Sequence, residues 1–415
     1  MELSQKLKQL DEQAVKKLRP VFDKIDEISQ KNTEKVLASF KNHRVSDSMF
    51  AGSTGYGYTD NGRDTLDAIY ADVLGAEAAF CRHNIVNGTQ AISIGLFGLL
   101  RPGDVMLSIT GRPYDTLSEV IGDKTHNGDG SLYDFGVKYD DVEMKDGKID
   151  YDAVDKKIKE HGEKIKVIFV QRSKGYAVRP TLSAEEIGEA AQFCHKLSNA
   201  YFVVDNCYGT FCDLSEPTHY GADMIIGSLI KNAGGGLANC GGYIAGTKRA
   251  VELASYRLTT VGIGTEVGAT IGENRRMFQG LFMAPHTVAQ AKKTAAYASY
   301  IFSHLGYDVE PSWDVDRHDI IQTVTFGTPD GLCNFCRGIQ AGSPVDAFVV
   351  PEPWAMPGYD DPVIMAAGTF VSGASIEISA DGPLRAPYTA YFQGGLTFES
   401  GRYAILTAAK TILGE

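Results

Sequence analysis

Long apolar runs, positive charge and paired cysteines are all scarce in this chain of 415 residues. The longest apolar stretch, residues 91–100, is about half as long as a membrane-spanning helix. The opening residues, MELSQKLKQLDEQ, show no apolar core of a signal peptide. Acidic residues outnumber basic ones by 52 to 40, and the net charge of −12 repels nucleic acid and anionic membranes. Seven scattered cysteines do not form a disulfide framework. We therefore expect a cytoplasmic protein that binds a small molecule, and neither nucleic acid nor a membrane.

The first 50 residues are predicted to form a helical arm. Apolar side chains recur at spacings of three to five residues over about residues 1–42, which is typical of an amphipathic helix. An arm this polar buries too little apolar surface to fold alone, so we expect it to pack on the body or on a neighbouring subunit. The Gly/Tyr-rich stretch that follows, GSTGYGYTDNGRD, has the composition of a loop.

Residues 51–285 are predicted to form a large α/β domain, because short apolar runs alternate there with helical patterns. Wholly apolar runs are typical of buried parallel strands. They span residues 105–109, 167–170, 202–204, 224–226 and 243–245. Ser183 and Glu186 form a capping box in front of a helix over residues 184–198.

Residues 286–415 change character and are predicted to form a smaller α+β domain. A helix over residues 286–305 is followed by strand-like pieces at 320–326 and 347–350. A final helix is expected near residues 401–412.

Polar residues stand at element ends of the large domain, where α/β proteins bind ligands. Asn87-Gly88-Thr89-Gln90 opens an apolar helix, so its free backbone N–H groups suit a phosphate, although an ordinary helix cap has the same composition. Asp205 ends the run YFVVD, either as a ligand-binding acid or as a turn residue. Lys231 ends the run ADMIIGSLIK, either as a nucleophile or as a surface lysine.

These residue types together match the needs of pyridoxal 5'-phosphate (PLP). PLP requires a lysine for a Schiff base, a carboxylate on its pyridinium nitrogen, an aromatic face and a phosphate cradle. Lys231, Asp205, Tyr114 and Gly88-Thr89 supply one of these each. The sequence therefore favours a PLP enzyme that acts on an amino acid.

The chain also resembles a known group, the cystathionine lyases and methionine γ-lyase of fold-type I PLP enzymes. It is most similar to the methionine γ-lyase-like family named for aluminium resistance. The resemblance runs from about residue 50 to 410, through the segments YTDNGRDTLDAIYADVLGAE, NGTQAISIGLFGLLRPGDVML, FVVDNCYGTF, GADMIIGSLIKNAGGG and SADGPLRAPYTAYFQGGL. It implies PLP as cofactor and a mostly parallel seven-stranded sheet in the large domain, with a smaller C-terminal domain.

The resemblance implies a role for each matching residue. Lys231 holds the cofactor and moves protons on the substrate, Asp205 pairs with the pyridinium nitrogen, and Tyr114 stacks on the ring. The phosphate is bound by backbone N–H groups and one hydroxyl, those of Gly88, Thr89 and Ser228.

A tyrosine and an arginine from the neighbouring subunit complete the phosphate site in this group. Tyr58 matches the tyrosine, and Tyr56 competes with it. Arg63 is the nearest arginine, although Asp60 stands at the family spacing. The resemblance therefore implies a homodimer or homotetramer with shared active sites.

Two departures from the family pattern lie near the substrate. Ile230 replaces a threonine, so one phosphate-binding hydroxyl is missing. The asparagine that touches the cofactor falls at Gly175, and its replacement is left open among Gln171, Arg172 and Ser173. These changes leave the identity of the substrate open.

We expect a PLP-dependent carbon–sulfur lyase for a sulfur amino acid, of the cystathionine β-lyase or methionine γ-lyase type. Arg385 is the predicted ligand of the substrate carboxylate, because guanidinium and carboxylate match as a two-pronged pair, and Arg402 is the alternative. Transamination, γ-replacement, or a catalytically weak PLP-binding protein with a role in aluminium tolerance are the rival functions.

No metal site is expected, because the histidines show no ligand spacing. Cys333 and Cys336 are interpreted as two unrelated thiols. Cys207 and Cys212, on either side of the turn after Asp205, are interpreted as buried bystanders.

Overall fold

The computed structural model describes residues 3–125, 128–356 and 359–415. In these residues the large domain has a seven-stranded sheet with the order β1-β7-β6-β5-β4-β2-β3. Its strands are β1 (Ala78–Arg82), β2 (Val105–Ser108), β3 (Lys138–Asp141), β4 (Ile165–Gln171), β5 (Tyr201–Asp205), β6 (Met224–Ser228) and β7 (Gly242–Gly246). The neighbours from β6 to β3 pair in parallel, and only β7 runs against its two neighbours. The predicted mostly parallel sheet is confirmed, but the run at residues 243–245, expected to be a parallel strand, forms the antiparallel β7.

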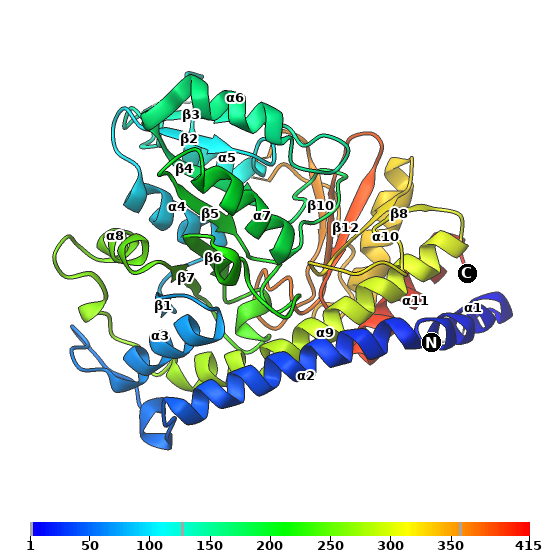
Figure 1. Ribbon diagram of the computed structural model, residues 1–415. Helices are drawn as coiled ribbons and strands as arrows, with labels where there is room; N and C mark the ends of the chain where they lie inside the picture. The colour runs from blue at the N-terminus through cyan, green and yellow to red at the C-terminus, as the bar shows by residue number, and fades with distance from the viewer. Residues whose placement is uncertain (1–2, 126–127, 357–358) are drawn as a thin grey trace.

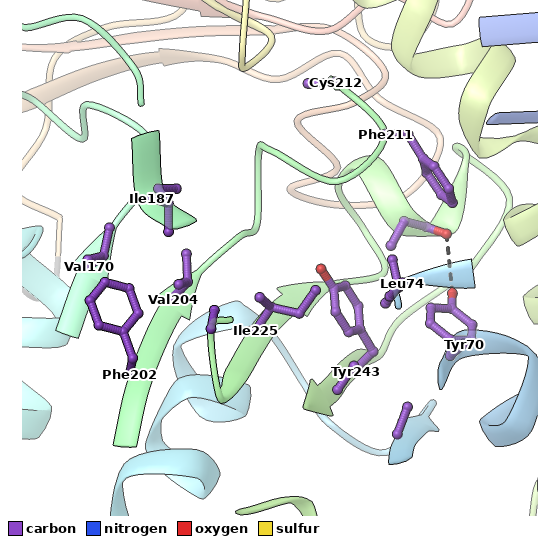
Figure 2. Packing of buried hydrophobic residues seen from close by; sticks show 14 of the residues in the cluster. Tyr70, Leu74, Val170, Ile187, Phe202, Val204, Phe211, Cys212, Ile225 and Tyr243 are labelled. Carbon is purple, nitrogen blue, oxygen red and sulfur yellow. Dashed lines mark hydrogen bonds between the residues drawn. The ribbon is translucent and has the colours of Figure 1, made fainter. Parts of the chain in front are cut away.

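Helices cover both faces of this sheet (Figure 1), as the two-faced apolar strands require. One face packs on α4 (Gly88–Leu99), α5 (Asp115–Ile121) and α8 (Lys248–Leu258). The other packs on α3 (Asn61–Val73), α6 (Tyr151–His161) and α7 (Ala184–His195), where the predicted capping box is present. Figure 2 shows Val170, Val204 and Ile225 of three neighbouring strands in this second layer, with Ile187 of α7 beside them. The helices on both faces thus hold the ends of β4, β5 and β6 in place.

The N-terminal arm consists of α1 (Gln5–Lys17) and α2 (Arg19–Asn42). Helix α2 lies along α9 (Asn274–His304) in Figure 1. The Asn32 amide anchors it by donating to the carbonyl oxygens of Phe211 and Asp213, at 3.4 and 2.9 Å. The arm therefore packs on the body of its own chain.

Helix α9 begins earlier than the sequence indicated. The prediction placed its start at residue 286, but it starts at Asn274 and contains Pro285 in its interior. Proline is usually a helix boundary because it lacks an N–H donor, and tertiary packing overrides that preference here. The helix runs through the predicted boundary between residues 51–285 and 286–415, and the division into these domains stays a prediction.

The C-terminal part carries a five-stranded antiparallel sheet with the order β10-β11-β12-β9-β8 in the described residues. Its strands are β8 (Asp308–Glu310), β9 (Ile321–Thr325), β10 (Val363–Ala366), β11 (Ser379–Pro383) and β12 (Thr389–Gln393). Helices α10 (Pro329–Ala341) and α11 (Phe398–Leu413) pack against it.

The strand predicted at residues 347–350 is wrong. These residues form a loop in which Phe348 is 86% exposed. The prolines that follow, Pro351 and Pro353, cannot donate to a strand ladder, so the apolar run finds no pairing partner there. Among the described helices, none is long and apolar enough to cross a bilayer.

Candidate active site

A cavity of about 310 Å³ lies between the two sheets. Its large-domain wall comes from the carboxyl ends of β4, β5 and β6 and from the N-terminal ends of α4 and α5. Its other wall comes from β9, β10, β11 and β12. A larger groove, about 1180 Å³, runs between the N-terminal helices and the body, but the residues that line it include none of the predicted site residues. The smaller cavity is therefore the candidate site, at the strand ends where α/β proteins bind ligands.

Six of the predicted residues meet in this cavity. They are Gly88, Thr89, Tyr114, Asp205, Ser228 and Lys231. They come from four separate elements and their flanking turns, so only the fold brings them together. The side-by-side pairing of β5 with β6 places Asp205 opposite Ile226, five residues before Lys231.

Lys231 follows the end of β6 and points at an aromatic face. Its Nζ lies 4.1 Å from the centre of the Tyr208 ring. Burial lowers the pKa of Lys231, but its neighbours Tyr208, Cys207, Asp205 and Tyr114 raise it, and the net shift is upward. The amine therefore lies in the cavity between an aromatic ring and buried acidic side chains.

Asp205 is buried at the last position of β5, where it is 5% exposed. Its Oδ1 accepts a hydrogen bond of 3.1 Å from the backbone N–H of Cys207. Burial raises the pKa of the Cys207 thiol, so that group stays protonated beside the carboxylate. A buried carboxylate of this kind suits a cationic ring nitrogen of a ligand.

The turn that opens α4 leaves room for a ligand. Asn87 caps the helix by accepting from Gln90 N at 2.8 Å, and the backbone N–H groups of Gly88 and Thr89 stand in its first turn. A Cβ atom at residue 88 would lie 2.8 Å from Cys207 Sγ and 3.9 Å from Lys231 Nζ. Only glycine keeps this space open, and a phosphate beside helix N–H groups fits it.

Tyr114 is held in place by two neighbours. Its hydroxyl lies 3.0 Å from Thr89 Oγ1, and its backbone N–H donates to Gln171 Oε1 at 2.9 Å. Burial raises the pKa of this phenol, so it stays neutral. The ring is therefore fixed between the phosphate-binding turn and the end of β4.

Gly175 stands where the related lyases have an asparagine that touches the cofactor, and the structure shows what surrounds this position. Gly175 lines the cavity, and a Cβ there would lie 2.7 Å from Gln171 Nε2, so Gln171 occupies the neighbouring space. Ser173 also lines the cavity. Arg172 does not, because its buried guanidinium binds Asn206 Oδ1 at 2.7 Å and Asp213 Oδ2 at 2.6 Å. Two of the three proposed replacements thus face the cavity.

Tyr58, Tyr56 and Arg63 lie outside the cavity of their own chain. Tyr56 and Tyr58 are 74% and 60% exposed, and their rings stack at 5.6 Å. The Arg63 guanidinium is buried and donates to the carbonyl oxygens of Gly57 and Gly268, at 2.7 and 3.0 Å. Arg63 thereby holds the loop that carries the two tyrosines.

The two candidate arginines for the substrate carboxylate are far from equivalent. Arg385 pairs with Asp361 Oδ2 at 3.1 Å. Burial raises the pKa of Asp115 and of Tyr391, which both line the cavity, and the nearby charge of Arg385 opposes both shifts. Arg385 stands at the rim of the site without lining it. Arg402 forms a two-pronged pair with Asp11, at 2.7 and 2.6 Å, and does not line the cavity.

The sequence interpretation missed the polar side of the C-terminal wall. Asp381 of β11 and Gln393 of β12 both face the cavity, while Ala380 and Phe392 of the same strands pack in the core behind them. Alternation of polar and apolar residues in SADGP and TAYFQ carried this signal. Tyr176, in the loop after β4, completes the polar wall.

The cysteines singled out in the sequence are buried, and Cys207 lies beside Asp205 at the cavity. Cys333 and Cys336 are buried on α10, and Cys212 is buried with its Sγ 3.3 Å from the Tyr208 carbonyl oxygen. Burial raises the pKa of the Cys212 and Cys333 thiols. Within the described part of the chain no group of three potential metal ligands is found.

Comparison with known proteins extends these observations. A family model described as methionine gamma-lyase matches residues 7–413. The uncharacterized protein YnbB of Bacillus subtilis is 51% identical over 395 residues, which are 95% of this chain and 93% of that protein. No activity is attached to that relative.

Solved structures are similar over the whole chain. A carbon–sulfur lyase involved in aluminum resistance from Clostridium novyi is 48% identical, with a TM-score of 0.94, covering 98% of this chain and 96% of that one. A protein from Clostridium acetobutylicum, provisionally described as a cystathionine beta-lyase involved in aluminum resistance, is 47% identical with a TM-score of 0.95, covering 98% and 96%.

More distant structures show the fold alone. The pyridoxal-5'-phosphate-dependent protein YhfS of Escherichia coli shares 16% identity at a TM-score of 0.64, covering 94% of this chain and 97% of that one. The predicted fold-type I architecture is thereby confirmed, and the residues of the cavity fit the predicted cofactor, PLP. From the family model over residues 7–413 and from relatives near 50% identity, the chain belongs to the methionine gamma-lyase family.

Proposed function

We propose that the chain is a PLP-dependent lyase that breaks a carbon–sulfur bond of an amino acid. The observation that carries this proposal is the meeting of Lys231, Asp205, Tyr114 and the Gly88 turn around one cavity, in a chain of the methionine gamma-lyase family. These are the four supports that PLP requires of a protein. Carbon–sulfur lyases among the similar structures favour elimination over the other reactions of amino acids.

Each residue has a task in this reaction. Bound PLP supplies an electron-poor ring that takes up the electrons of the bond broken at Cα. Lys231 Nζ would take the Cα proton, and for loss of a thiolate from Cγ it would also take a proton from Cβ. With PLP bound, Asp205 would pair with the ring nitrogen, Tyr114 would stack on the ring, and Gly88, Thr89 and Ser228 would hold the phosphate. The thiolate would leave from Cβ or Cγ with the electrons of its C–S bond and would be protonated by the proton that Lys231 carries.

Arg385 is proposed to bind the α-carboxylate of the substrate. Its present partner, Asp361, is an exposed carboxylate at the rim, and exchange of one carboxylate for another costs little at such a position. Arg402 is engaged with Asp11 and is not proposed for this role.

The active unit is proposed to be at least a dimer, with Tyr58 completing the phosphate site of its partner. The exposure of Tyr58 outside its own cavity supports this arrangement. Arg63 is proposed to act through the loop that it holds, since its guanidinium is already engaged with backbone carbonyl oxygens.

Lyase chemistry is tested with L-cystathionine, L-methionine, L-cysteine and L-homocysteine. We expect release of pyruvate or 2-oxobutanoate together with ammonia from at least one of them, and loss of that release in Lys231→Ala, which lacks the base. Keto acid is measured by coupled reduction. Stoichiometric conversion of the cofactor to its pyridoxamine form without ammonia would instead establish the transamination alternative.

Substitution of the two arginines separates their roles. Arg385→Lys should raise KM by about 10- to 100-fold, with a smaller change in kcat, because lysine cannot form the two-pronged carboxylate pair. Arg402→Lys is the matched control and should leave KM near the wild-type value. Steady-state kinetics on the best substrate measures both, and an unchanged KM in Arg385→Lys contradicts the assignment.

A mixture of two inactive chains tests the shared site. Tyr58→Ala and Lys231→Ala are refolded together in equal amounts, so that mixed dimers carry one site with both residues intact. Activity should return to about a quarter of that of the wild type, the share of intact sites under random pairing. If a verified mixed dimer shows no recovery of activity, Tyr58 does not contribute to the neighbouring site. Tyr56→Ala in place of Tyr58→Ala is the control for the competing tyrosine.

A further inference from the structure

The cavity is lined by more carboxylate side chains than the cofactor requires. Asp115, Asp205 and Asp381 line it, and Lys231 is the one lysine or arginine among the described residues that line it. With Asp205 assigned to the ring nitrogen and Lys231 to the cofactor, Asp381 is left without a cationic side chain beside it. A carboxylate in such a place is costly unless a cation or hydrogen-bond donors compensate it.

The fold aims Asp381 at the interior of the cavity. In the pairing of β11 with β12, Asp381 stands opposite Tyr391, and Ser379 stands opposite Gln393. All four line the cavity, because every second residue of a strand faces the same side. Gln393 Nε2 donates to Asp381 Oδ2 at 3.3 Å, and the Tyr176 hydroxyl is its other hydrogen-bond partner. These neutral donors orient the carboxylate and leave its charge unmatched.

Burial raises the pKa of Asp381 to about 7, although Tyr176, Lys231 and Gln393 act in the opposite direction. The phenols that surround it do not titrate in the same range, because their pKa values are all raised further above their ordinary values. They are those of Tyr176, Tyr208, Tyr359 and Tyr391. The pKa of Lys231 is raised as well. Between pH 6 and 8, Asp381 is thus the group of this wall that changes charge.

We propose that Asp381 selects substrates whose side chain carries an ammonium group beyond the sulfur atom, the class to which L-cystathionine belongs. This inference rests on the proposed lyase function, because it concerns the substrate of the same cavity. The ammonium supplies the cation that the protein itself does not provide. Amino acids with an uncharged side chain, such as methionine, leave the carboxylate unmatched and bind less well.

The acidic rim favours the same class of substrate. Asp360 and Asp361 stand with Asp115 near the guanidinium of Arg385. Burial raises the pKa of Asp115, the charges of Asp360 and Asp361 add to this shift, and Arg385 opposes it. A substrate that enters with an ammonium on its side chain is attracted there, while Arg385 is available for a carboxylate.

A matched pair of substrates tests the proposal. S-(2-aminoethyl)-L-cysteine and S-propyl-L-cysteine have the same length, and only the first carries a side-chain ammonium. The loaded wild-type enzyme should prefer the first, and Asp381→Asn should reduce the ratio of the two kcat/KM values by about 10- to 100-fold, the worth of a charged hydrogen bond. Asp381→Glu should restore part of the preference. Asp152→Asn removes an exposed carboxylate of α6 that does not line the cavity, and it should leave the ratio unchanged. An equal loss of kcat for both substrates in Asp381→Asn overturns the proposal and assigns Asp381 to proton transfer.

Binding separates this proposal from the proposed function. Calorimetry on PLP-loaded Lys231→Ala, which cannot remove the Cα proton, measures the dissociation constants of both compounds without turnover. The preference for S-(2-aminoethyl)-L-cysteine should increase between pH 7 and pH 9 as Asp381 ionises, because this variant lacks the Lys231 charge that lowers the Asp381 pKa. The preference should be flat in Lys231→Ala/Asp381→Asn. If the wild type cleaves neither compound, loss of a thiolate from Cβ of cysteine thioethers is excluded, while this preference still supports the role of Asp381. Equal binding of the two compounds at pH 9 overturns it.

Discussion

The site depends on the placement of the Lys231 amine beside the buried carboxylate of Asp205, at the ends of two paired strands. β5 and β6 are neighbours, so Asp205 and the turn that carries Lys231 emerge side by side. Apolar helices on both faces of the sheet hold these strand ends rigid, and the opening at Gly88 keeps space between them for a ligand. A buried ammonium and a buried carboxylate are each costly alone, and their proximity offsets much of that cost.

Position, rather than the titration of a lysine, identifies the reactive amine. Lys174 and Lys292 are both buried, and burial lowers the pKa of each, which is the usual sign of a nucleophilic lysine. Neither lines the cavity, and Lys292 Nζ donates to the Cys212 carbonyl oxygen at 2.7 Å. The pKa of Lys231 is raised instead, because Tyr208, Cys207, Asp205 and Tyr114 together outweigh the effect of burial. The place of Lys231 in the cavity therefore supports its proposed role better than its pKa does.

The large domain could be predicted from the sequence because its strands are apolar on both faces and end in polar residues. Asp205, Lys231 and Gly88 could each have had a purely structural role, as a turn residue, a surface lysine and a helix cap. Only their occurrence together favoured a role in cofactor binding. The C-terminal wall was harder, since short strands with alternating polarity give weak signals, and Asp381 and Gln393 were missed for that reason. Tertiary packing accounts for the error at Pro285, which a local pattern does not reveal. The error at residues 347–350 came from the apolar run itself, because the prolines that follow it were not given enough weight.

The two walls of the cavity divide the work. In the proposed function, the large domain holds PLP and the C-terminal sheet faces the substrate, because the two walls line opposite sides of the cavity. The first assignment is the central claim, and borohydride reduction of the PLP-loaded protein followed by peptide mass spectrometry tests it most directly. The account predicts a single pyridoxyl group on the peptide that contains Lys231, and none in Lys231→Ala. A pyridoxyl group on Lys174 or Lys292, or one that persists in Lys231→Ala, would contradict it.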